Sequence, residues 1–290
     1  MPEAAKVEDL KPGDHACLTF TDSEERLDLV AAFVRDGLRA DQRVLCLTDA
    51  IPEAVLRSEF AERGLPVQHA TRTGQLTVTP ATDMFITDGS FSASRMIETL
   101  AAEIKRAGRD GHPGLRITSD MCWALRPAGG LEQLITYESQ FAALLADSQA
   151  TAICQYDRQC FDTITLAGVA ANHALAVAAV TYHDDALLRI CRQYLPPGLR
   201  VAGEIDYRAI DPLTRALSEA LALDEHVHVN LAELRFIDVV AAGAFIQAAL
   251  SMSNEQRMTV RCQRAIHKVL QTLGAGELPR LRLVVVDHDD

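Results

Sequence analysis

The sequence predicts an α/β protein made of two sheet-containing domains. Segments with the two-residue period of strands alternate with amphipathic helical segments along most of the 290 residues. The length allows one large domain or two domains of medium size, and we favour two. The polar sequence HDD at 183–185 interrupts the alternation. We therefore expect one domain over residues 1–183 and a second, smaller domain over residues 186–290.

Composition and charge narrow the class of protein. Apolar residues make up 48% and charged residues 23% of the chain, which is typical of a globular protein. A net charge of −12 argues against binding to the phosphates of nucleic acid. No run reaches the roughly 18 apolar residues of a membrane span, and the first thirty residues are too charged for a signal peptide. We expect a cytoplasmic protein whose seven cysteines, without a CxxC pair, are reduced thiols.

The first domain alternates strands and helices in the manner of a mostly parallel sheet covered on both faces. Its expected strands are residues 16–20, 43–48, 67–70, 76–79, 115–119 and 151–156, and its expected helices are 24–38, 53–63, 93–107, 131–146 and 161–171. Asp22 and Glu25 stand at capping-box spacing at the start of the first helix. Gly64 ends the second helix.

The second domain begins with two strands joined by YLPPG, whose prolines and glycine favour a hairpin turn. Its expected strands are residues 186–193, 199–206, 227–231, 258–262 and 281–286, with helices over 212–223, 240–250 and 265–273. Asp238 stands where a strand gives way to a helix, and its carboxylate can cap the first free amides of that helix. The acidic tail VDHDD at the C-terminus is expected to fray.

In open parallel sheets, ligands bind at the carboxyl ends of the strands. The loops at those ends carry TFTDSEER, TDAIPE, SDMCWAL and ICQYD. The order of strand, loop and helix resembles the RecA and KaiC type of ATPase, in which the first loop binds phosphate. Here that loop has neither glycine nor lysine, so we expect no cradle for phosphate and no ATP hydrolysis.

Several dispersed motifs resemble the MEDS sensory domain over about residues 8–180. They are GDHACLTFTDSEER at 13–26, ITSDMCWAL at 117–125, YESQF at 137–141 and ICQYD at 153–157. That family is a relative of the KaiC ATPases without the P-loop, found in bacterial and archaeal regulators. The resemblance implies that the domain senses a small, hydrocarbon-derived ligand. The family's recurring positions include Asp157, and the ligand-binding residues that the resemblance implies are His15, Cys17, Glu25, Asp120, Met121, Trp123, Glu138 and Tyr156.

Four of these residues allow more than one interpretation. His15 and Cys17 share one face of a strand and could ligate a soft or borderline metal, or could instead pack in the core or line a pocket. Trp123, the only tryptophan, could form the floor of an apolar pocket or belong to the core. Glu138 lies on an otherwise apolar helix and could pair with His15 or point into solvent.

GEID at 203–206 and VNLAELRFIDVVAAGAF at 229–245 resemble the STAS domain of anti-sigma factor antagonists, over about residues 186–290. Members of that family carry a serine or threonine after the aspartate that corresponds to Asp238, and a kinase-type anti-sigma factor phosphorylates it. This chain has Val239 and Val240 there, and neither side chain has a hydroxyl group. The resemblance implies a partner-binding surface around Asp206, Asp238, Val239 and Val240. The implied partner is a kinase-type anti-sigma factor or another STAS protein.

Two classes of function follow from these residues. The first is a bacterial signalling regulator of transcription, in which the first domain senses a ligand or partner and the second binds a protein. The alternative is a metal-dependent or redox enzyme that uses the crevice at His15 and Cys17, although no nucleophile, base and orienting acid stand at recognisable spacing. The sequence leaves the cofactor unknown, and apolar sheet edges would allow a homodimer.

Overall fold

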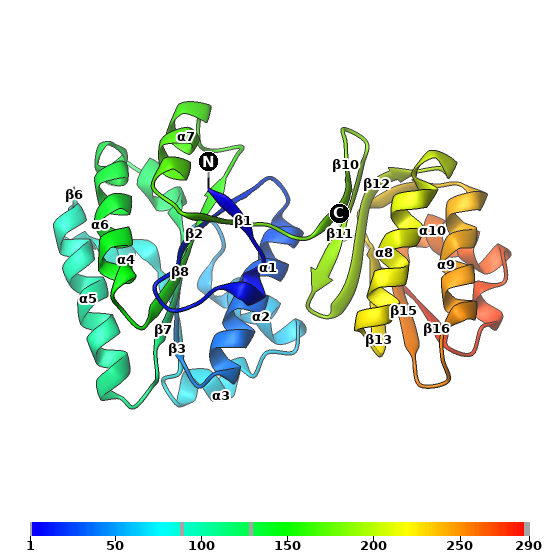
Figure 1. Cartoon of the computed structure of the whole chain (residues 1–290), viewed down its shortest axis with the longest axis horizontal. Coiled ribbons are helices and arrows are strands. Elements are labelled where there is room, and N and C mark those ends of the chain that lie inside the picture. Colours follow the sequence, from blue (N-terminus) through cyan, green and yellow to red (C-terminus); the bar gives the residue numbers. More distant parts are fainter. Residues whose placement is uncertain (1, 88–89, 128–129, 287–290) are drawn as a thin grey trace. The chain divides into compact units, whose positions relative to one another are not determined.

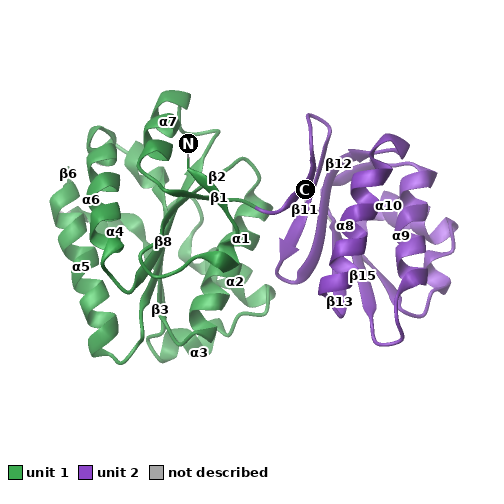
Figure 2. Ribbon diagram, in the orientation of Figure 1, with its two compact units in different colours: residues 1–178 green, residues 179–290 purple. Residues whose placement is uncertain are grey.

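The computed structural model describes residues 2–87, 90–127 and 130–286 (Figure 1). The chain divides into two compact units, Met1–Ala178 and Ala179–Asp290 (Figure 2). Among the described residues, no helix combines the length and the apolar character needed to cross a membrane. Residues 287–290 of the acidic tail, for which fraying was expected, lie outside the described ranges.

Unit 1 contains a parallel sheet of seven strands in the order β1-β9-β2-β8-β7-β3-β4. The strands are β1 (Glu3–Ala5), β2 (His15–Phe20), β3 (Arg43–Thr48), β4 (Leu76–Pro80), β7 (Leu115–Asp120), β8 (Ala150–Asp157) and β9 (Leu175–Val177). The interior strands β3 and β7 are buried at every position, as expected of a parallel sheet covered on both faces. The predicted α/β architecture is confirmed.

Helices cover both faces of this sheet (Figure 1). They are α1 (Ser23–Arg39), α2 (Glu53–Glu62), α3 (Val67–Arg72), α4 (Ala81–Phe85), α5 (Ala93–Arg109), α6 (Leu134–Ala146) and α7 (Thr163–Ala171). Helices α5 and α6 lie on one face, and α1 lies on the other. A short ribbon of β5 (Ile86–Thr87) and β6 (Ser90–Phe91) precedes α5.

The strand predicted over residues 67–70 is wrong, because these residues form α3. Val67 and Ala70 are buried, and their spacing of three residues places both on one face of a helix turn. Pro66 stands at the N-cap, where its missing N–H group removes no helical hydrogen bond. A short apolar run of this kind does not by itself distinguish strand from helix.

Unit 2 contains a mixed sheet in the order β10-β11-β12-β13-β15-β16, and β14 also pairs with β12. The strands are β10 (Thr181–Asp184), β11 (Leu188–Tyr194), β12 (Pro197–Ile205), β13 (His226–Leu231), β14 (Leu234–Ile237), β15 (Arg257–Gln263) and β16 (Leu281–Val286); the helices are α8 (Ile210–Leu223), α9 (Val239–Ser251) and α10 (Arg264–Thr272). Strands β11 and β12 form the predicted hairpin, with Tyr194 opposite Pro197. Strand β10 pairs with β11, so residues 181–184 belong to the sheet of unit 2.

Gly203, the first residue of GEID, allows two chain segments of unit 2 to approach closely. Its φ angle is +101°, and a Cβ atom built on it would lie 1.9 Å from the carbonyl oxygen of Leu187. Only glycine fits this position without strain. The residue thereby lets β12 lie close to the start of β11, where Leu188 is opposite Gly203.

Candidate functional site

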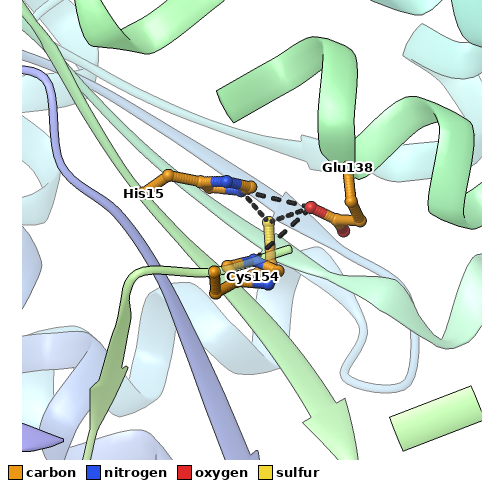
Figure 3. Close-up of side chains that lie close together, drawn as sticks. His15, Glu138 and Cys154 are labelled. Carbon is orange, nitrogen blue, oxygen red and sulfur yellow. Dashed lines mark hydrogen bonds and ion pairs between the residues drawn. The ribbon is translucent and has the colours of Figure 1, made fainter. Parts of the chain in front are cut away.

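Four buried polar side chains gather on the face of the unit 1 sheet that α6 covers. They are His15, Glu138, Cys154 and His173, and their potential ligand atoms all lie within 4.8 Å of one another. Figure 3 shows His15, Glu138 and Cys154 pointing toward a common centre from two strands and a helix. His15 opens β2, Cys154 lies within β8, Glu138 lies in α6, and His173 follows α7.

The local structure explains why these side chains converge. Strands β2 and β8 are neighbours with Cys17 opposite Cys154, and alternation along each strand turns His15 and Cys154 to the same face. On α6 the buried positions recur at helical spacing, and Glu138 occupies one of them. Its side chain is 0% exposed, so the interpretation in which Glu138 points into solvent is wrong.

Glu138 is the centre of the cluster. Its Oε2 atom lies 3.1 Å from His15 Nε2 and 3.4 Å from His173 Nε2. The Cys154 thiol lies 3.8 Å from the same oxygen and 3.4 Å from His15 Nε2. Tyr156 donates its hydroxyl hydrogen to the other carboxylate oxygen, Oε1. The carboxylate is therefore held with one oxygen directed at both imidazoles.

Burial and charge act against each other in this cluster. Burial alone would raise the pKa of Glu138, but His173, His15 and the Tyr156 hydroxyl together hold that pKa below its ordinary value. Burial lowers the pKa of His173 to about 4, despite the attraction of Glu138. Burial and the Glu138 charge raise the pKa values of Cys154 and Tyr156 well above their ordinary ranges. At neutral pH the cluster therefore contains a carboxylate, a neutral His173 ring and a protonated thiol.

The sheet divides the predicted ligand-binding residues between its two faces. His15, Cys17, Glu138 and Tyr156 lie on or beside the cluster face, although the Cys17 thiol donates to the carbonyl of Leu175 at 3.6 Å and lies outside the group of four. Of the two metal ligands predicted from the strand pattern, His15 and Cys17, only His15 therefore belongs to the group of four. Two further members of the predicted set, Met121 and Trp123, are buried in the apolar core that includes Cys154.

Asp120 and Glu25 belong to the opposite, α1-covered side. Asp120 Oδ2 accepts from Arg26 Nη2 at 2.7 Å and from the backbone N–H of Ala50 at 2.9 Å. Arg26 also donates to Gln155, so the carboxyl end of β7 is tied to α1 and β8. A cavity beside Arg26 and Gln155 measures about 10 Å³, which is room for about one water molecule. Glu25 is half-buried in the first turn of α1, and Asp157 accepts from the backbone N–H of Gln159.

The predicted partner-binding residues lie where β12 and β14 meet the starts of two helical segments in unit 2. Asp238 caps α9 by accepting from the N–H of Ala241 at 2.7 Å, and its second oxygen accepts from the N–H of Tyr207 at 2.8 Å. Asp206 caps the following turn and pairs with Arg208 at 2.7 Å. Val239 and Val240 are 65% and 53% exposed. The two aspartates accept hydrogen bonds from backbone N–H groups where the strands meet the helical segments, and this region is the polar corner of unit 2. The two valines beside it present an apolar surface.

These valines begin a groove between α8 and α9. The groove has a volume of about 530 Å³. Its apolar lining includes Leu217, Leu221, Val239, Val240, Ala244 and Ala248. Thr214 and Ser218 of α8 and Ser251 at the end of α9 also line it, so the hydroxyl groups of the groove lie away from the start of α9.

Replacing Asp238 by alanine should lower the stability of α9 by about 1–2 kcal/mol, because the first amides of the helix lose their cap. Hydrogen exchange of the amides in residues 239–251 measures this change within the full-length chain. Asp238→Asn retains an acceptor for the N–H of Ala241 and should lose less than half as much. Unchanged protection of α9 in Asp238→Ala would contradict the capping role.

Sequence reasoning missed Cys154 and His173 as members of the cluster. Cys154 stands in the ICQYD motif and His173 follows the last helix of unit 1, but neither stands at a spacing typical of metal or catalytic sites. His15 and His173 are separated by most of unit 1 and meet because β9 and β8 both pair with β2. The only sign of the cluster in the sequence was therefore the residue types, histidine and cysteine. No local spacing indicated that these residues would meet.

Comparison with known families gives two matches along the chain. The model of the MEDS domain, described as the methanogen/methylotroph, DcmR sensory domain, matches residues 14–174. The model of the STAS domain matches residues 196–288. Both resemblances inferred from the motifs are confirmed. All four cluster residues fall within the first match, and Asp206, Asp238 and the exposed valines fall within the second.

Individual proteins are similar over parts of the chain. The transcriptional repressor DcmR of Methylorubrum extorquens is 26% identical over 162 residues, which is 53% of this chain and 56% of the repressor. A KaiC-like protein of Pyrococcus horikoshii is 13% identical with a TM-score of 0.47, covering 66% of this chain and 80% of its own. An anti-sigma factor antagonist of Mycobacterium paratuberculosis is 16% identical with a TM-score of 0.28, covering 36% and 84%. The chain spans little more than half of the curated repressor, and the fold assignment rests on its own strand order.

Proposed function

Because this chain belongs to the MEDS family and carries a STAS domain, we propose that it is a signalling regulator of transcription rather than an enzyme. Unit 1 receives the signal and unit 2 binds a protein partner. The observation that carries the proposal is the exposed apolar groove that begins at Val239 and Val240, directly beside the Asp238 cap. A net charge of −12 favours control through a protein partner over direct contact with DNA.

The sensory input is proposed to act at the cluster face of unit 1. There His15, Glu138 and Tyr156 lie together among apolar side chains, which is the composition of a small-ligand site. Glu25 and Asp120 are not part of this proposal, since Asp120 is engaged by Arg26 and backbone amides on the other side of the sheet. The ligand is a small molecule or ion, because the cluster side chains are at most 5% exposed.

The output is proposed to be docking of a kinase-type anti-sigma factor on the groove between α8 and α9, with another STAS protein as the alternative partner. Exposed apolar residues next to a rigid polar corner are typical of the centre and rim of a protein interface. Val239 and Val240 occupy the positions after Asp238 and offer no phosphate acceptor. Docking is therefore proposed to be independent of phosphorylation at this corner.

The enzyme alternative at His15 and Cys17 receives less support from the geometry. His15 is 5% exposed, and Cys17 is 2% exposed with its thiol directed at the carbonyl of Leu175. A substrate would have to displace packed side chains to reach either group. Burial also raises the pKa of Cys17 to about 11, which keeps the thiol protonated and weakly nucleophilic.

Val239→Asp should weaken partner binding by at least about tenfold, because a charge would be buried at the start of the groove beside the Asp238 carboxylate. The measurement is the Kd of the full-length chain for a panel of purified kinase-type anti-sigma factors and STAS proteins from the same organism. The matched control is Val55→Asp, in which the same change is made at a 48% exposed valine in the first turn of α2.

Three results would speak against this proposal. One is that no member of the panel binds the unmodified chain. Another is that Val55→Asp and Val239→Asp reduce affinity equally, which would place the interface elsewhere. The third is catalytic turnover of a substrate that depends on His15 and Cys17. Both valine variants change exposed residues, so the stability of each should stay within about 0.5 kcal/mol of the unmodified chain.

A further inference from the structure

We infer that His15, Glu138, Cys154 and His173 bind one divalent cation of the borderline class that includes Zn²⁺. Two imidazoles, a thiol and a carboxylate are the ligand types that zinc takes in proteins. This inference specifies the ligand that the sensory site of the proposed function would bind. Only the role of the site as a signal input rests on the proposed function. The binding of the cation itself is independent of any docking at unit 2.

Four of the six distances between the ligand atoms are close to the edges of one tetrahedral site, and all six are within 4.8 Å. With bonds of about 2.0–2.2 Å to nitrogen and oxygen and about 2.3 Å to sulfur, the edges of a tetrahedron measure about 3.3–3.6 Å. The two edges from Glu138 Oε2 to the imidazoles measure 3.1 and 3.4 Å. The two edges at the Cys154 sulfur measure 3.4 and 3.8 Å. A small shift of each side chain would complete the coordination.

The hydrogen bond at the far side of His173 directs a free lone pair into the cluster. Its Nδ1 atom lies 2.9 Å from the carbonyl oxygen of Val169, and a carbonyl can only accept, so Nδ1 carries the hydrogen. The Nε2 atom on the other side of the ring lies 3.4 Å from Glu138 Oε2 and has no hydrogen-bond partner among the described residues. A cation between these two atoms would satisfy both lone pairs.

Hydrogen bonds from the surroundings orient two of the four ligands, Glu138 and His173. The Tyr156 hydroxyl binds Glu138 Oε1 and leaves Oε2 directed at the cluster, as carboxylate ligands of metals are commonly held. The His173 ring is fixed in the same way by Val169. Rigid positioning of this kind distinguishes a built site from a chance group of polar residues.

Charge balance favours a divalent ion. The carboxylate of Glu138 contributes one negative charge, and Cys154 contributes a second when it binds as thiolate. The thiol loses its proton to solvent as the metal–sulfur bond forms, so one proton is released for each ion bound. A divalent cation then makes the buried site neutral, which removes the cost of an uncompensated charge in the core.

The test is to measure metal binding by the full-length chain, by three thiol variants and by Tyr156→Phe. We expect one Zn²⁺ or Co²⁺ per chain, and a thiolate-to-cobalt charge-transfer band in the Co²⁺ form. Cys154→Ser should abolish that band, and Tyr156→Phe should weaken binding by about 10- to 100-fold through loss of the hydrogen bond to Glu138. Cys46→Ser, which removes a buried thiol from β3, is the matched control and should bind as the unmodified chain does.

Cys17→Ser decides between the four-residue site and the pair of His15 and Cys17. Retention of the charge-transfer band in this variant supports the four-residue site, and its loss would overturn it. Absence of stoichiometric binding to the unmodified chain would also overturn it. Circular dichroism with a chelator present identifies a variant that fails to fold, and Tyr156→Phe then provides the independent comparison.

The same preparations separate this inference from the proposed function. Metal binding without any effect of the metal on partner affinity would leave the metal site in place and remove its role as the input. Partner binding by a chain that takes up no metal would overturn the metal site and leave the docking proposal unaffected.

Discussion

Replacing Arg26 by methionine is expected to lower the free energy of unfolding of unit 1 by about 3–5 kcal/mol. Arg26 and Asp120 are both nearly fully buried, and their side chains meet at 2.7 Å. Burial would raise the pKa of Asp120, but Arg26 and two backbone amides hold it below its ordinary value of 3.8. Without Arg26 the carboxylate would remain in the core without its cation, which is the main cause of the expected loss.

The measurement is denaturant unfolding followed by the fluorescence of Trp123, which is the only tryptophan and lies in unit 1. Arg106→Met provides a control, because Arg106 is 56% exposed and its ion pair with Asp110 should contribute no more than about 1 kcal/mol. Adding Asp120→Leu to Arg26→Met should recover much of the stability, since both charges are then absent. A loss below about 1 kcal/mol in Arg26→Met would contradict the structural role assigned to this pair.

The Arg26–Asp120 pair should also give unit 1 a pH dependence of known sign. A carboxyl group with a lowered pKa in the folded state contributes stability above its unfolded pKa and loses it as the pH falls through the folded value. The contribution of Asp120 is therefore complete at neutral pH and decreases below about pH 3.8.

Trp123→Ala is expected to destabilise unit 1 by about 3–5 kcal/mol, because it removes a large side chain that is 0% exposed. The indole ring packs against Phe91 at 4.6 Å and Phe85 at 5.8 Å between ring centroids. Thermal unfolding followed by circular dichroism measures the change, since the variant has no tryptophan fluorescence. The result decides between the two interpretations of Trp123, as a core residue and as the floor of a ligand pocket.

Trp123→Phe is the matched variant for this experiment. It retains an aromatic ring against Phe91 and removes the indole N–H group, which has no hydrogen-bond partner in the described part of the chain. We expect it to cost less than half as much as Trp123→Ala. A cost below about 1 kcal/mol for Trp123→Ala, together with loss of ligand binding, would instead favour the pocket interpretation.

The sequence alone determined the elements whose pattern is local. The amphipathic period of residues 24–38 predicted α1, and the Asp22 side chain caps it by accepting from the N–H of Glu25. The same reasoning found the β11–β12 hairpin and the Asp238 cap of α9. Helical period, turn chemistry and capping depend on residues only a few positions apart, so they can be read along the chain.

Only the tertiary structure decided which of these elements are neighbours. The strands β1 and β9 are three residues long, too short to show a period, yet they pair with each other at the edge of the sheet. The sheet separates Asp120 from Glu138, although the motifs that contain them appeared to belong to one site. Strand order determines such relations, and it depends on packing over the whole unit rather than on any local pattern.

The cluster of His15, Glu138, Cys154 and His173 also depends on which elements are neighbours, which no local pattern predicts. Three of the side chains have an identifiable local reason for pointing inward, from strand alternation or from helical period, whereas His173 lies after the end of α7, outside both patterns. Their meeting requires β2 to lie between β8 and β9, and α6 to cover that face of the sheet. Strand alternation therefore determined how His15 and Cys154 point, whereas the fold decided the positions of Glu138 and His173 and brought the four residues together.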